Sequence, residues 1–122
     1  MLEVRSVVTG VLSAGMLVLG ANAFGQEYPS KPVRIITFGA GSGSDFTSRQ
    51  LAQGISPALG QPVIVDNRVP IPASDAVSKS APDGYTLLVG GANIWVLPLL
   101  QKAPYDPAGF VPISLISREI NI

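Results

Sequence analysis

The chain has 122 residues, an apolar fraction of 47%, and eight basic residues balanced by eight acidic ones, so its formal net charge is zero. An apolar fraction of this size is typical of a chain that folds. A net charge of zero gives no electrostatic attraction to nucleic acid or to an anionic membrane surface. The absence of cysteine and histidine excludes a disulfide framework, a thiolate nucleophile, an imidazole base and an ordinary zinc site.

The first element is an apolar run over residues 7–19, which is shorter than the roughly 20 helical residues that span a bilayer. Arg5 precedes this run, and the small residues Ala21 and Ala23 follow it. This layout is typical of a secretory signal peptide cleaved after Ala23, and the alternative is a buried core helix. We therefore expect residues 1–23 to be a signal peptide and residues 24–122 to form the exported, folded part.

Short apolar runs rich in β-branched residues and bounded by proline and glycine predict four strands. These are residues 33–37, with Phe38 as a candidate extension, and residues 62–66, 85–91 and 111–117.

A helix is predicted over residues 45–59, where apolar side chains recur at helical spacing between an N-cap at Ser44 or Asp45 and a C-cap at Gly60. Pro57 should kink or shorten this helix. Residues 67–74 are expected to form a loop, residues 74–80 a short helix capped by Ser74, and residues 93–102 a helix broken by Pro98.

Strands that alternate with helices predict an α/β fold with a mostly parallel sheet, right-handed crossovers and flanking helices. In such folds ligands bind beyond the carboxyl ends of the strands. The loops of interest are therefore residues 39–45, 67–74 and 90–93.

The glycine-rich loop at residues 39–45 fails three motif tests. A dinucleotide fingerprint needs a third glycine where Ser44 stands, and a P-loop needs a lysine that this stretch lacks. A nucleophile elbow needs glycines two positions before and two positions after a serine, where Ser42 has Ala40 and Ser44, and it needs a histidine base, which the chain lacks. Two interpretations stay open: an anion cradle at a helix N-terminus, or simply a tight strand-to-helix turn.

Several separated segments together resemble one family. They are YPSKPVRII at residues 28–36, GSGSD at 41–45, LGQPVIVDNR at 59–68, SAPDGYTLLVG at 80–90 and PYDP at 104–107. Their order and spacing are similar to the N-terminal part of the tripartite tricarboxylate transporter solute receptors, the Bug-type extracytoplasmic binding proteins.

The resemblance implies one lobe of a periplasmic binding protein, with the second lobe absent, that acts in the periplasm without a cofactor and is not an enzyme. It implies a small carboxylated solute as ligand and the membrane permease subunits of a tripartite transporter as partners. Asp45 is expected to shape the first loop rather than to contact the ligand. The ligand-binding positions that the resemblance implies are Gly41, Ser42, Gly43, Ser44, Asp45, Ala73, Ser74, Gly91, Ala92 and Asn93.

The second loop departs from the family pattern, which is glycine-rich after the NR pair, because here it reads VPIPASD. Pro70 and Pro72 have no N–H to donate to a ligand. A lobe that stops near a fourth strand should also expose the apolar side chains of Ile113, Leu115 and Ile116.

Two other functions have less support in the sequence. A non-binding remnant or interaction module would self-associate through an exposed sheet edge. An enzyme would have to use Asp45, Asp66 or Asp83 without a base, metal set or nucleophile beside them. Two further residues have structural interpretations: Arg68 as a partner of Asp66 or of a loop carbonyl, and Trp95 as a packing aromatic.

Overall fold

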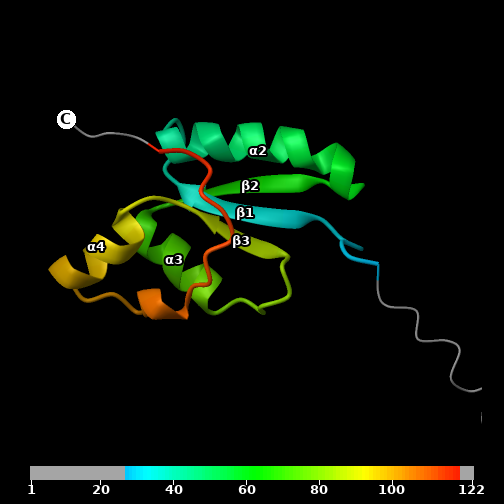
Figure 1. Ribbon diagram of the computed structural model, residues 1–122. Helices are drawn as coiled ribbons and strands as arrows, with labels where there is room; N and C mark the ends of the chain where they lie inside the picture. Colours follow the sequence, from blue (N-terminus) through cyan, green and yellow to red (C-terminus); the bar gives the residue numbers. More distant parts are fainter. Residues whose placement is uncertain (1–26, 119–122) are drawn as a thin grey trace, which may run out of the picture.

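The computed structural model describes residues 27–118, and the expected signal peptide lies outside these described residues (Figure 1). The elements alternate between strands and helices along the chain. They are β1 (Val33–Phe38), α2 (Gly43–Leu59), β2 (Val63–Arg68), α3 (Pro70–Ser78), β3 (Thr86–Val89), α4 (Asn93–Leu100) and the 3₁₀ turn η1 (Pro107–Gly109).

The three strands form one parallel sheet in the order β2-β1-β3, with Ile35 of β1 paired to Val65 of β2 and to Leu87 of β3. The predicted α/β fold with a parallel sheet is therefore confirmed. The central strand β1 is buried on both faces, as its continuous apolar run predicts, and Phe38 does extend it.

Helix α2 covers one face of the sheet and α3 covers the other (Figure 1). Ile36 and Phe38 pack with Ala73 of α3, Ile94 of α4 and Tyr105 in the main hydrophobic core. Because successive side chains of a strand face opposite ways, Val33, Ile35 and Thr37 of β1 face α2.

Helix α2 starts and ends on capping residues. Ser42 is the N-cap, in an extended conformation, and its Oγ accepts a hydrogen bond from the Asp45 N–H at 3.2 Å. The expected N-cap at Ser44 or Asp45 is therefore wrong by two or three residues, because a serine already stands at the last extended position before the helix. Gly60, with φ of 64°, ends the helix as predicted.

Three helices contain proline at positions where the sequence predicted a break or a loop. Pro57 lies inside α2, which continues to Leu59, and Pro98 lies inside α4, which continues to Leu100. The stretch expected as a loop is the start of α3, because Pro70 occupies the first helical position, where no intrahelical N–H is needed. Ser74 is thus in the middle of α3 and not its cap. None of the helices in residues 27–118 has the length and apolarity of a membrane span.

The predicted fourth strand is absent from the described residues, since residues 111–117 are not paired with any strand of the sheet. Within the described residues the outer edges of β2 and β3 have no neighbouring strand, so the segment leaves both available edges unpaired. The expected exposure of this segment is confirmed, because Ile113, Leu115 and Ile116 are 79%, 72% and 44% exposed.

Candidate functional site

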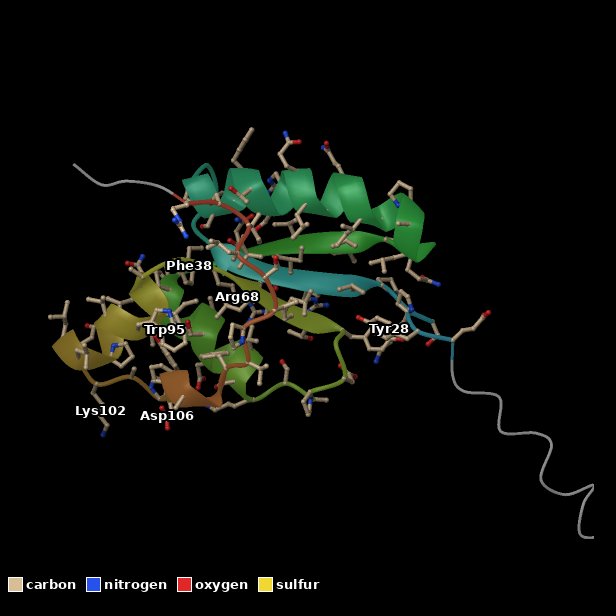
Figure 2. The ribbon with its side chains drawn as sticks, in the orientation of Figure 1. Tyr28, Phe38, Arg68, Trp95, Lys102 and Asp106 are labelled. Atoms are coloured by element: carbon tan, nitrogen blue, oxygen red, sulfur yellow. The ribbon has the colours of Figure 1, made fainter. Side chains whose placement is uncertain are left out.

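The helix N-termini of α2 and α4 lie at the carboxyl ends of β1 and β3, at one edge of the sheet (Figure 1). From β1 the chain proceeds to β2 on one side, whereas β3 lies on the other side of β1. Loops after such a pair of strands diverge and leave room for a ligand. Phe38 lies at this edge, where the carboxyl ends of the strands meet, and Tyr28 lies at the opposite end of the strands (Figure 2).

The N–H groups of the first loop are divided between internal acceptors and solvent. Those that hydrogen-bond within the loop and first turn belong to Gly41, Ser42, Asp45 and Phe46. Within the described residues, the N–H groups of Gly43 and Ser44 have no hydrogen-bond acceptor. Gly43 is exposed and Ser44 half-buried. This pair of free donors at the positive end of a 17-residue helix can hold an anion.

The hydroxyl groups of the loop add to this donor set. The Oγ atoms of Ser42 and Ser44 lie 3.0 Å apart. The Ser42 Oγ accepts from the Asp45 N–H and lies 3.4 Å from the Phe38 carbonyl, so its single proton goes either to that carbonyl or to Ser44. In the first arrangement the Ser44 hydroxyl donates to Ser42, and in the second it is free to donate outward.

Asp45 is buried beneath the loop, with 6% exposure. One carboxylate oxygen accepts from the Gly41 N–H at 2.8 Å, and the other accepts from Asn67 Nδ2 at 2.8 Å and from Arg49 Nε at 2.9 Å. The backbone N–H of Gly41, followed by the Asn67 amide, holds the pKa of the Asp45 carboxyl below its ordinary value, against the effect of burial. The carboxylate is therefore held inward and shapes the loop.

The β3–α4 loop depends on close backbone approach. A Cβ atom at Gly90 would lie 2.6 Å from the Phe38 ring, so only glycine lets this loop lie against the end of β1. The predicted site residues Gly91, Ala92 and Asn93 follow and are all exposed at the same edge. No side chain caps α4, and the Ile94 N–H bonds to the Gly91 carbonyl at 3.2 Å.

The N-terminus of α3 is poor in donors. Pro70 and Pro72 have no N–H, so Ile71 is the one residue among the first three of the helix with an N–H to offer. The predicted site residues Ala73 and Ser74 are fully buried within the helix. The Ser74 Oγ has no hydrogen-bond partner within the described residues.

The two arginines at this edge are each engaged by a neighbouring carboxylate. Arg68 donates to Asp66 through Nη2 at 2.8 Å and Nε at 3.2 Å, which confirms its predicted structural contact. Arg49 pairs with Asp45. Trp95 is 49% exposed and lies outside the core cluster, so its expected role as a packing aromatic is not supported.

Asn67 belongs to the site, although the sequence alone did not single it out. Its signal was the DNR segment at the end of the second predicted strand. A polar residue at the carboxyl end of a strand next to β1 is positioned to reach the first loop, but the sequence analysis placed residue 67 only in the loop of interest at 67–74 and gave roles in this segment to Asp66 and Arg68.

The fold is an α/β unit whose first helix begins with two N–H groups that have no acceptor within the described residues, and comparison with known proteins specifies its family. Residues 47–119 match the family described as tripartite tricarboxylate transporter family receptor. The chain belongs to this family, which is a receptor family and not an enzyme class.

Several relatives support this assignment. A UPF0065 protein of Bordetella pertussis is 32% identical over 93% of this chain and 39% of its own length. Protein BugT of the same organism is 35% identical over 80% of this chain and 32% of its own length. The chain thus spans about a third of the length of these relatives.

Solved structures give the same fold. The periplasmic binding protein BugD has a TM-score of 0.59 and 35% identity over 66% of this chain and 28% of its own. A protein from R. palustris, solved with adipate, has a TM-score of 0.57 and 27% identity over 66% of this chain and 29% of its own.

Proposed function

We propose that the chain acts in the periplasm as a solute-binding lobe and holds one carboxylate group of a small organic acid at the N-terminus of α2. The observation that carries this proposal is the pair of accessible, unpartnered N–H groups of Gly43 and Ser44. The Ser44 hydroxyl supplies a third donor when the Ser42 proton goes to Ser44 and not to the Phe38 carbonyl, and the exposed residues Gly91, Ala92 and Asn93 lie on the other side of the site.

The charges at this edge favour an anion that carries few negative charges. Arg49 is bound to Asp45, and Arg68 is bound to Asp66, so neither guanidinium is free to neutralise a ligand. The donors are then neutral N–H and O–H groups, which hold a carboxylate through directed hydrogen bonds and the helix dipole.

The solved structure with adipate supports this ligand class, because adipate is a small dicarboxylate. Membership of the receptor family supports delivery of the bound acid to the membrane permease subunits of a tripartite transporter. The signal-peptide pattern at residues 1–23 supports export to the periplasm.

The expected affinity follows from the number of donors. Each charge-assisted hydrogen bond contributes about 1.5–3 kcal/mol, association costs about 4–15 kcal/mol, and micromolar binding needs about 8 kcal/mol net. A site with three donors is therefore expected to bind in the millimolar range.

Calorimetric titration of the 122-residue chain with adipate, other dicarboxylates and a tricarboxylate tests this function. We expect heat of binding at millimolar concentration with at least one dicarboxylate and weaker binding of the tricarboxylate. The absence of heat with every acid at that concentration would rule out carboxylate binding by this chain.

The exposed segment at residues 111–117 favours a second candidate function, self-association through a sheet edge. Val111 and Ile113 are 85% and 79% exposed, and within residues 27–118 the outer edge of β3 has no neighbouring strand. Extended apolar segments add readily to such edges. Light scattering after size exclusion decides this point, because a monomer at all concentrations excludes self-association.

A further inference from the structure

The Asn67 side chain connects three parts of the molecule. Its Nδ2 donates to Asp45 Oδ1 at 2.8 Å and to the Phe38 carbonyl at 3.1 Å, and its Oδ1 accepts from Arg49 Nη2 at 3.0 Å. One amide from β2 therefore holds both the last carbonyl of β1 and the two charged side chains in the first turns of α2.

The hydrogen-bond chain continues into the glycine loop. The second oxygen of Asp45 accepts from the N–H of Gly41, whose φ of 80° requires glycine. With the Gly41 N–H turned inward, Ser42 is free to cap the helix, and the next two N–H groups of the chain are left without internal acceptors. The direction of these free donors thus depends on where the Asp45 carboxylate is held.

The same contacts compensate the negative charge of Asp45. A buried carboxylate beside a carboxylate-binding loop would repel its ligand. Here the Arg49 guanidinium donates to Asp45 at 2.9 Å and is itself held by Asn67. The pair carries no net charge, and the Asp45 carboxylate is held by the Gly41 N–H and by Asn67 of β2.

We propose that Asn67 is a positioning residue of the binding site: by holding Asp45 and Arg49 it orients the first loop so that Gly41 donates inward and Gly43 and Ser44 donate to the ligand. This inference rests on the proposed function for the ligand and on the hydrogen-bond geometry for the loop.

Four variants test the proposal, with amide hydrogen exchange at Gly41 and adipate affinity as readouts. N67A removes the amide, N67D places a second carboxylate against Asp45, and D45N removes the first carboxylate. The double variant D45N/N67D exchanges the two groups, which restores one donor–acceptor pair between these positions and keeps the total charge of the native chain.

D75N is the matched control. Asp75 pairs with Lys79 four residues along α3, as Asp45 pairs with Arg49 four residues along α2. This substitution removes a carboxylate from a similar helical ion pair without touching the loop, so we expect Gly41 exchange and adipate affinity within about twofold of the native chain.

In the native chain we expect slow exchange of the Gly41 N–H. N67D should speed this exchange at least tenfold and weaken adipate binding at least tenfold, because two like charges in contact separate and release the loop. D45N/N67D should restore most of the slow Gly41 exchange and most of the adipate affinity. Recovery should be incomplete, because a carboxylate at position 67 cannot donate to the Phe38 carbonyl.

Gly41 exchange that stays native in N67A and N67D, while amides within α2 confirm an intact fold, would overturn the proposal. Failure of the double variant to recover either readout would also count against it, because a general loss of structure is not repaired by exchanging two groups. If the native chain binds no adipate, the proposed function fails, and the exchange data alone decide whether Asn67 orients the loop.

Discussion

Two helix N-termini at the same edge of the sheet have opposite character. The first turn of α2 contains Gly43 and Ser44, whose N–H groups have no internal acceptor within the described residues. The first turn of α3 contains Pro70 and Pro72, which have no N–H at all. Both turns form helix starts, α2 with the Ser42 side chain as its cap and α3 with proline at its first position and no side-chain cap, and they differ in the N–H groups that they offer a ligand.

This contrast shows that a helix N-terminus binds an anion only if its first N–H groups exist and are accessible. In α2 the internal groups of the loop are satisfied by Asp45 and Ser42, which leaves the next two donors for a ligand. In α3 proline fits the helix start because its fixed φ is helical and no intrahelical N–H is needed there, but it offers no donor to a ligand. The ligand is therefore expected to contact α2 and to bypass the N-terminus of α3.

The largest expected effect comes from moving proline into α2. G43P removes one donor but keeps the helix start, because Ser42 already has the extended conformation, with ψ of 164°, that a residue before proline adopts. Loss of one charge-assisted hydrogen bond, about 1.5–3 kcal/mol, should weaken adipate binding about 10- to 150-fold in a calorimetric titration.

The matched control G43A keeps the N–H and should change the affinity little. The reverse change, P72A, gives α3 a donor and should leave the affinity within about twofold. Equal losses of adipate affinity in G43P and G43A would show that the N–H of residue 43 does not bind the ligand. A clear gain of affinity in P72A would show that the N-terminus of α3 does contact it.

A smaller effect distinguishes the buried serines of the two helices. Ser48 of α2 donates to the Ser44 carbonyl at 2.7 Å, whereas the Ser74 Oγ of α3 has no partner within the described residues. Because an unpartnered buried hydroxyl is unfavourable, S74A should raise the free energy of unfolding by about 1 kcal/mol, and S48A should lower it by about 0.5–1.5 kcal/mol.

Thermal unfolding measures both serine variants, because 1 kcal/mol corresponds to a Tm shift of about 4–8 °C in a domain of this size. A Tm that falls in S74A would mean that the hydroxyl does have a favourable contact.

The smallest effect is the acid dependence of the α2 loop. The pKa of Asp45 in the folded chain is below its ordinary value of 3.8, so the unfolded chain binds more protons in this range. The stabilisation is complete above the ordinary value and is lost as the pH falls through the folded value. Between pH 5 and pH 3, the native chain should therefore lose more stability than D45N does, as measured by urea unfolding. Parallel losses in the two proteins would contradict this role of Asp45.

The sequence predicted what depends on local pattern. The apolar runs of β1, β2 and β3 and the left-handed Gly60 cap were all recognised, because each depends on the residue itself and its near neighbours. The glycine spacing of residues 39–45 and the absence of histidine likewise excluded nucleotide binding and serine catalysis, because those motifs are equally local.

What the sequence could not predict depends on contacts between distant residues. Pro70 and Pro72 resemble a loop in sequence, yet packing of Ala73 against β1 favours a helix there. The run at residues 111–117 has strand composition but pairs with no strand within residues 27–118. Asn67 lies 22 residues from Asp45 in sequence, and only the pairing of β2 with β1 brings their side chains together.

The most direct test of the central claim is a titration of the ¹⁵N-labelled chain with adipate, followed through the backbone amide signals. The account predicts that the amides of Gly43 and Ser44 shift as adipate is added and that the amide of Ile71 at the start of α3 does not. A shift of Ile71 without shifts of Gly43 and Ser44, or no shift at any of the three, would contradict it.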